Sequence, residues 1–372
     1  MLTRKRKMQA CLSVLVSSVL MISHQAAGQS TDDFAANYPV ADPFLGEMIQ
    51  PDEIASAKGL IKTLEDQIRS QYVRGGARRD AHPKAHGCVA ASFEVNQSIP
   101  ANLAHGVFQL GAQYDALIRF SNGSPNATGD DSTGDTRGMA VKLFGVPGEK
   151  LFSRPGHEDV QDFIMISSPF FFINSASGYT QFFEIVDEGS LLKMTRIPFI
   201  LGFKGSYNAY RMLSQKIANP VETRYWSVVP YQLGLGDGRQ AVKYSARPCQ
   251  PGSTVIPDNP GKNYLREAMV NTLSAGPVCM DFMIQPRTGS ELAVEDVITE
   301  WSESEAPFYP VARITLHQQE FDTAEKNLAC ENETYNPWHA LPEHKPLGTI
   351  SRMRKVVYEA ISDLRHDMNG IN

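Results

Sequence analysis

Three residues near the carboxyl end of the chain have types and spacing that could bind a metal ion. The apolar pattern over 350–366 predicts a helix, and on it Arg354, Tyr358 and Arg365 fall within about 60° of one another. An arginine four residues before a tyrosine can reach the phenol oxygen, and its charge favours phenolate over phenol. A phenolate is a hard anionic ligand suited to ferric iron. The alternative is a surface helix with solvated arginines.

A second group of polar side chains lies just before an expected strand, in the stretch that contains His82 and His86. A histidine that is neutral near pH 7 can take a proton from one oxygen and return it to another. Two histidines four residues apart could bind a metal on a helix, but Pro83 and Gly87 disfavour a helix here. These histidines are therefore candidates for acid–base catalysis, and the alternative is a pair of solvated loop side chains.

A third group consists of basic residues inside apolar, strand-like runs. Arg119 and Ser121 end one such run, and the segment 135–142 reads Asp-Thr-Arg-Gly-Met-Ala-Val-Lys after a polar turn. An arginine on a strand needs an anionic partner when it is buried. The carboxylates of a bound cofactor would serve, and so would ordinary aspartates.

The elements that must position these residues follow from hydrophobic periodicity and turn signals. A helix, then many strands, then helices indicate an α+β domain built on a β-barrel. We expect helices over 53–72, within 179–214 and over 350–366, and strands over 88–95, 116–120, 139–144, 163–173, 278–284 and 311–316.

The amino terminus has the order of a secretory signal peptide. Four basic residues at 4–7 precede a mostly apolar run from about 10 to 22, and small residues follow at 26–28. Cleavage near Gly28 would give a signal peptide over 1–28, an N-terminal arm over 29–45 and a single domain over 46–372. The apolar run is short for a membrane span, and the alternative is an uncleaved anchor. We expect a periplasmic or secreted protein without stable membrane insertion.

The net charge limits the classes of partner that are expected, and the cysteine count limits the disulfides. The formal net charge is −6, and loss of the four basic residues at 4–7 would make it −10. An acidic surface argues against nucleic acid or an anionic membrane as the main partner.

Four cysteines would remain after cleavage, so one or two disulfides are expected, with the pairing open. They are Cys88, Cys249, Cys279 and Cys330.

Taken together, these motifs resemble the haem catalases, in order and in rough spacing, from about residue 79 to 366. The resemblance is closest to the short branch that lacks the C-terminal helical domain and includes small bacterial peroxidases and allene oxide synthase. It implies a catalase-like antiparallel β-barrel with surrounding helices, haem b as cofactor and a C-terminal haem-ligating helix. The motifs are Arg-x-x-His-x-Lys (79–84), Arg-Phe-Ser (119–121), Asp-x-Arg-Gly-x-Ala-Val-Lys (135–142), Pro-x-Phe-Phe-Ile (169–173) and Arg-x-x-x-Tyr (354–358).

The resemblance implies roles for individual residues. Tyr358 matches the iron ligand and Arg354 its partner. His82 matches the distal acid–base histidine and Ser121 the serine that orients it, with His86 as the alternative because the following strand is one residue out of register. The remaining matches are to haem contacts, namely Arg79, Arg119 and Arg365 to propionate-binding arginines and Phe171 and Phe172 to distal aromatics.

One position departs from the family pattern. The family places an asparagine three residues before the proline of the Pro-x-Phe-Phe motif, and Ile166 stands there in this chain. Loss of that asparagine removes a hydrogen bond to bound peroxide, so we expect weak catalase activity and relatively better peroxidase activity.

The function expected is that of a haem-dependent oxidoreductase acting on hydrogen peroxide or organic hydroperoxides. Its partners would be the hydroperoxide and an electron donor that the sequence does not identify, and a homo-oligomer is compatible with the sequence. One alternative is rearrangement of fatty-acid hydroperoxides, with 169–173 and 192–203 lining a lipid channel. The other is a non-catalytic haem-binding protein.

Overall fold

The computed structural model describes residues 31–79 and 82–371. The signal peptide expected over 1–28 lies outside this part of the chain. The residues group into two compact units, 1–37 and 38–372. Helix α1 (Thr31–Ala36) belongs to the first. The second unit begins at Tyr38, and within it Tyr38 and Leu45 are buried.

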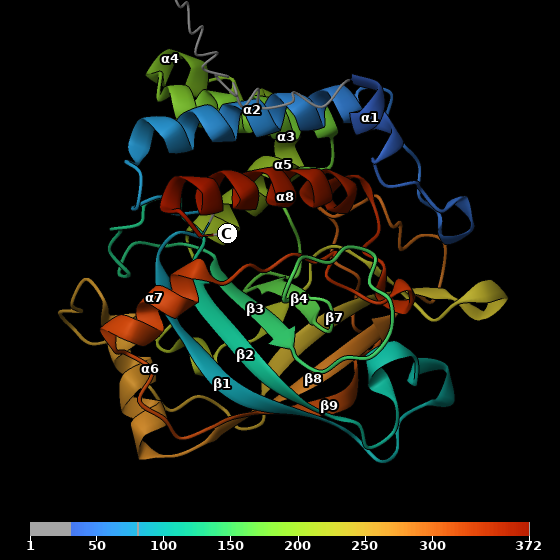
Figure 1. The fold of residues 1–372 in the computed structure, drawn as a ribbon, viewed down its shortest axis with the longest axis vertical. Coiled ribbons are helices and arrows are strands. Elements are labelled where there is room, and N and C mark those ends of the chain that lie inside the picture. Colours follow the sequence, from blue (N-terminus) through green and yellow to red (C-terminus); the bar gives the residue numbers. More distant parts are fainter. Residues whose placement is uncertain (1–30, 80–81, 372) are drawn as a thin grey trace, which may run out of the picture. The chain divides into compact units, whose positions relative to one another are not determined.

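Nine strands in the described residues form one antiparallel sheet, and eight of them close into a barrel (Figure 1). The order round the barrel is β4-β3-β2-β1-β9-β8-β7-β5, and β5 pairs with β4 through Ile166 and Trp226 to complete it. β6 adds to the edge of β7. The strands are β1 (Ala85–Val95), β2 (Gln113–Asn122), β3 (Arg137–Leu143), β4 (Gln161–Ile166), β5 (Tyr225–Trp226), β6 (Tyr231–Leu233), β7 (Gln240–Pro248), β8 (Val278–Pro286) and β9 (Tyr309–Leu316).

Alternating side chains decide which face of each strand fills the barrel. On β2, Ile118 and Phe120 are fully buried in the main apolar cluster. Because successive side chains point to opposite faces of a strand, Arg119 and Ser121 lie on the outer face. The register places Arg119 opposite Ala140 of β3, which itself pairs with Ile164 of β4. A strip of outer-face positions thus crosses three adjacent strands.

Helix α8 covers this side of the barrel, and α2 lies on the other side of α8 (Figure 1). The mixed α+β architecture with an antiparallel barrel and surrounding helices, expected from the sequence, is confirmed. The helices of the second unit are α2 (Glu53–Gln71), α3 (Ala176–Glu188), α4 (Leu191–Met194), α5 (Ile197–Leu213), α6 (Tyr264–Ala275), α7 (Ala324–Asn332) and α8 (Thr349–Asn369), with short 3-10 turns at Pro43–Leu45, Ala101–Leu103, Gly106–Phe108, Pro220–Glu222, Gly236–Gly238 and Pro342–His344.

Three strand and helix predictions differ from the structure. The strand expected over 163–173 ends at Ile166, since Ser167, Ser168 and Pro169 leave the sheet. The helical stretch within 179–214 breaks after Gly189, whose left-handed backbone ends α3. Strands β5, β6 and β7 were not expected, because two of them are too short to show alternation.

A buried arginine fixes the start of α8. Arg352 is fully buried and donates to both carboxylate oxygens of Glu53 on α2, at 2.7 and 2.9 Å. It also donates to Glu47 at 2.6 Å and to Glu295 at 3.2 Å. Burial alone would lower the pKa of Arg352, but the three carboxylates raise it above its ordinary value. The guanidinium therefore stays charged and joins three segments to α8.

We expect Arg352→Met to reduce the free energy of unfolding by about 3–5 kcal/mol, because it removes the guanidinium that binds the buried carboxylates of Glu47 and Glu53. Arg74→Met is a matched control, since Arg74 is 81% exposed and 3.8 Å from Asp367, and it should change stability by less than about 0.5 kcal/mol. Equilibrium denaturation measures both. Similar small losses in the two variants would contradict the role given to Arg352.

Candidate functional site

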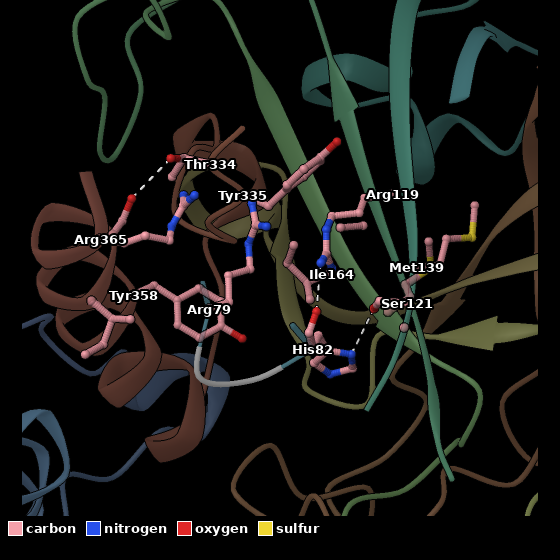
Figure 2. A pocket seen from close by; sticks show the side chains of 15 residues that line it. Arg79, His82, Arg119, Ser121, Met139, Ile164, Thr334, Tyr335, Tyr358 and Arg365 are labelled. Carbon is pink, nitrogen blue, oxygen red and sulfur yellow. Dashed lines mark hydrogen bonds between the residues drawn. The ribbon is translucent and has the colours of Figure 1, made fainter. Parts of the chain in front are cut away.

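A pocket opens between the outer face of β2–β4 and helix α8 (Figure 2). It contains about 740 Å³ of atom-free space, including its opening to solvent. Its walls are both polar and apolar, and consist of Arg79, His82, Arg119, Ser121, Gly138, Met139, Ala140, Ile164, Met165, Thr334, Tyr335, Tyr358, Ile361, Ser362 and Arg365.

Tyr358 enters the pocket from α8, and Figure 2 shows its hydroxyl directed toward the side where His82 lies. Arg354, one turn earlier, is hydrogen-bonded to Tyr179, and its guanidinium carbon lies 5.4 Å from the ring centre of Phe171. Burial lowers the pKa of Arg354, but Tyr358, Tyr179 and Tyr231 outweigh it and raise that pKa. A fixed positive charge therefore stands beside the Tyr358 phenol.

His82 lies on the opposite side of the pocket, before β1. Its Nδ1 is 3.0 Å from the hydroxyl oxygen of Ser121, and its backbone carbonyl accepts a hydrogen bond of 2.7 Å from Arg119. Its φ of 58° lies in the left-handed region, which side-chain-bearing residues adopt at a cost when the surrounding structure requires it. Burial, then the charges of Arg119 and Arg354, lower the pKa of His82 to about 4. The imidazole is therefore neutral near pH 7.

Gly138 makes this position of His82 possible. A Cβ atom at residue 138 would lie 2.6 Å from His82 Nδ1 and 2.7 Å from the Ser121 hydroxyl. Its backbone conformation is ordinary, so the requirement for glycine here is one of space. Sequence reasoning missed Gly138 as a site residue, although its place in the Asp-x-Arg-Gly motif was a signal.

His86, the alternative acid–base residue, points elsewhere. It is fully buried, and its Nε2 is 2.9 Å from the side-chain oxygen of Asn122. Its Nδ1 faces Asp131 at 3.8 Å. Burial lowers the pKa of His86 to about 3. His86 is a structural residue beneath the start of β1, because the bulge between Ala85 and Gly87 turns it away from the pocket.

Three arginines, Arg79, Arg119 and Arg365, line one part of the pocket and outnumber the acidic side chains that line it. Arg79 pairs with Glu331 at 3.4 Å. Burial and then the charge of Arg79 lower the pKa of Arg119 to about 9, and the same two causes lower the pKa of Arg365 to about 9. The buried Nε of Arg119 has no hydrogen-bond partner in the described residues. Such a cluster fits a ligand with carboxylate groups.

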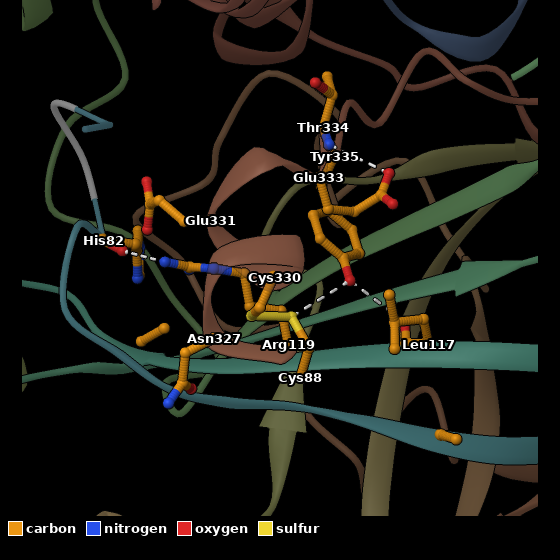
Figure 3. Close-up of a disulfide and its surroundings, with 12 residues drawn as sticks. His82, Cys88, Leu117, Arg119, Asn327, Cys330, Glu331, Glu333, Thr334 and Tyr335 are labelled. Carbon is orange, nitrogen blue, oxygen red and sulfur yellow. Dashed lines mark hydrogen bonds between the residues drawn. A yellow bond between two sulfur atoms is a disulfide. The ribbon is translucent and has the colours of Figure 1, made fainter. Parts of the chain in front are cut away.

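The chain after α7 forms the wall next to this cluster. The Glu333 carbonyl accepts hydrogen bonds from Arg79 and Arg365, and Thr334 and Tyr335 line the pocket. The disulfide between Cys88 and Cys330 fastens the end of α7 to β1 beside Arg119 (Figure 3).

Both disulfides that four cysteines allow are formed. Cys249 is bonded to Cys279, and Cys88 to Cys330. The sequence had left three full pairings open, and the register of β1 against β2 explains why Cys88 lies next to the pocket, since it pairs with Arg119.

Other expected site residues lie outside the pocket wall. Phe171 is buried and packs against Phe172 with ring centres 4.4 Å apart. Ile166 shares a strand face with the lining residue Ile164 and pairs with Gly138. The two segments expected to line a lipid channel do not line this pocket, since Phe170 and Ile173 belong to the core and residues 192–203 are mostly at the surface.

We expect the His82 ring to stay neutral at pH 6, where a histidine of ordinary pKa is more than half protonated. Because folding lowers this pKa to about 4, the native state is favoured above pH 6.5 and loses that advantage as pH falls from 6.5 to about 4. Nitrogen NMR of ¹⁵N-labelled histidines, assigned with His82→Gln, measures the ring directly. An imidazolium signal from His82 at pH 6 would contradict the buried position.

The sequence matches no family model, and no curated protein is similar enough to count as a match. Solved structures do match. A fungal catalase has a TM-score of 0.57 at 14% identity over 81% of this chain. Catalase A from Saccharomyces cerevisiae has a TM-score of 0.57 and 16% sequence identity over 88% of this chain. A bacterial catalase has a TM-score of 0.56 and 16% sequence identity over 97% of this chain. The alignments cover 61%, 68% and 67% of those chains respectively. This protein therefore has the fold of the catalases.

Proposed function

We propose that this protein is a haem-dependent oxidoreductase that acts on hydrogen peroxide or organic hydroperoxides, with Tyr358 as the iron ligand. The observation that carries the proposal is the placement of Tyr358 and neutral His82 on opposite sides of one pocket. The catalase fold supports a peroxide substrate at the level of the reaction class.

The residues present suit haem b. Tyr358 would supply the oxygen ligand, and Arg354 would place a positive charge beside it. Arg79, Arg119 and Arg365 would bind the propionates, which could also accept a hydrogen bond from the unpartnered buried Nε of Arg119. The macrocycle would pack on the apolar lining, which consists of Met139, Ala140, Ile164, Met165 and Ile361. When bound, haem supplies the redox chemistry at the O–O bond.

His82 would move the proton during that reaction. A neutral imidazole can accept the hydroperoxide proton from one oxygen and return it to the leaving oxygen. Ser121 holds Nδ1 at 3.0 Å, so we assign the proton transfer to Nε2. Arg119 is a positioning residue in this scheme, because it binds the His82 carbonyl and keeps the backbone in its left-handed conformation.

Two further expectations remain proposals. We propose export to an oxidising compartment, which is supported by the two disulfides, and an external electron donor for the peroxidase reaction. The pocket gives no support to rearrangement of fatty-acid hydroperoxides, because neither 169–173 nor 192–203 contributes to its lining. A non-catalytic haem protein would share the Tyr358 site and differ in lacking peroxide turnover.

The ligand assignment is tested by spectra of the hemin-loaded protein. Wild type should show a high-spin ferric tyrosinate spectrum, and Tyr358→Phe should lose it, because the anionic oxygen is gone. Tyr335→Phe is the matched control, since Tyr335 lines the same pocket and should leave the spectrum unchanged. An unchanged spectrum in Tyr358→Phe would refute the ligand assignment, and failure of wild type to take up hemin would refute the haem proposal.

The balance of activities is tested at Ile166. We expect wild type to dismute hydrogen peroxide slowly, and Ile166→Asn to raise that rate about tenfold, the effect of one added hydrogen bond to the reacting oxygen. Ile166→Leu is the control, which keeps an apolar side chain. Steady-state oxygen release and donor oxidation are measured side by side. Wild-type dismutation as fast as that of an ordinary catalase would show that the asparagine is not needed here.

A further inference from the structure

Large apolar side chains project from α4 and α5 into solvent. Leu191 and Leu192 on α4 are 82% and 81% exposed, and Phe199 and Phe203 on α5 are 88% and 93% exposed. Farther along α5, Tyr207, Tyr210 and Leu213 are exposed by 56%, 70% and 63%. We call these seven residues the α4–α5 patch. Single exposed apolar residues are common, but seven large ones within residues 191–213 are a candidate interaction surface.

The α5 residues of the patch lie on the side that α5 turns away from the protein, and the non-helical backbone of Gly202 kinks the helix between Phe199 and Phe203. Leu201, Gly205 and Met212 on the opposite face are buried. Gly205 lies so close to the chain below that a Cβ would be 2.4 Å from the Phe172 carbonyl oxygen. Asn208 donates to the carbonyls of Phe171 and Ile298, at 2.8 Å each. The inner face thus fixes α5 in place, and its aromatic side chains remain outside.

The segment that carries the patch has a charge opposite to that of the whole chain. Residues 189–221 contain no aspartate or glutamate and include Lys193, Arg196, Lys204, Arg211 and Lys216, in a protein of formal charge −6. Lys193 also pairs with Glu188, which lies just before this segment. The acidic total had argued against anionic membranes, but it does not describe this surface. An exposed aromatic and aliphatic face with basic residues along it is the composition of helices that lie in a membrane interface.

We propose that the α4–α5 patch docks the protein on the surface of an anionic lipid bilayer. The charge selects this partner over a second copy of the chain, because two like-charged copies of this segment would repel each other on close approach. No helix in the described residues is long and apolar enough to cross a membrane. This proposal goes beyond the peroxide chemistry and does not depend on haem.

The test uses a tryptophan reporter in the full chain. The native residues Trp301 and Trp338 are buried and Trp226 is half-buried, so Phe203→Trp adds an exposed reporter within the patch. Leu110→Trp is the matched control, at a position 55% exposed on another segment. Both carry residues 1–30 unchanged, so that segment contributes equally. The probes are vesicles of phosphatidylcholine with and without phosphatidylglycerol.

We expect the emission of Phe203→Trp to shift to the blue with phosphatidylglycerol vesicles, and that of Leu110→Trp to stay unchanged. Raising the salt concentration should weaken binding. Adding Arg196→Gln or Lys216→Gln to the reporter should weaken it by about fivefold each, and Phe199→Ser by about tenfold. Circular dichroism checks that each variant is folded.

Three outcomes would overturn the proposal. They are no shift of Phe203→Trp with phosphatidylglycerol, equal shifts of both reporters, and a shift that appears without vesicles as protein concentration rises. The last would show that a second copy of the chain covers the patch.

Discussion

The burial of Arg352 against three carboxylates is the constraint on which the candidate site depends. Once its guanidinium is bound by Glu47, Glu53 and Glu295, α8 can neither rotate nor slide without separating buried charges. Tyr358 stands six residues farther along, about 120° away round the helix axis. The rotation that places Arg352 among the carboxylates therefore also turns Tyr358 into the pocket. The side chain that positions α8 and the side chain proposed to act from it are different residues of one rigid element.

The charges of the pocket are unbalanced in the opposite sense to those around Arg352. Around Arg352 the carboxylates outnumber the guanidinium group, whereas in the pocket the arginines outnumber the carboxylates. Arg79, Arg119 and Arg365 face a space near the carboxylates of Glu331 and Glu333, and after burial it is repulsion by Arg79 that lowers the pKa values of Arg119 and Arg365. A dianionic ligand would relieve that repulsion, so binding and folding of this region are coupled. Burial is the main cause of the lowered pKa of His82, and the charge of Arg119 in this cluster adds to it. Arg119 thus contributes both to the proposed cofactor site and to the neutral state of the proposed base.

Much of this arrangement could be predicted from the sequence, because periodicity and motif order report local geometry. The helix at 350–366 and the strand that carries Arg119 and Ser121 were expected and are present. The sequence could not decide whether His82 or His86 faces the pocket, since this depends on a bulge in β1 that no sequence pattern predicts. Gly138 was missed because its importance comes from atoms of two distant segments. The exposure of the apolar side chains within 192–203 was not expected, since apolar residues do not reveal which side of a helix the rest of the chain covers.

The order of β1 between β2 and β9 has a consequence for how the molecule is made. One half of the pocket is encoded by residues 79–165 and the other by residues 334–365. The barrel cannot close until β9 has been synthesised. Cys88 cannot form its disulfide until Cys330, 242 residues later, has been synthesised. Contacts of such sequence separation form late and slowly. During synthesis the arginine-rich half-site therefore stands open and incomplete, and a cofactor held from both sides can be retained only after nearly the whole chain has been made.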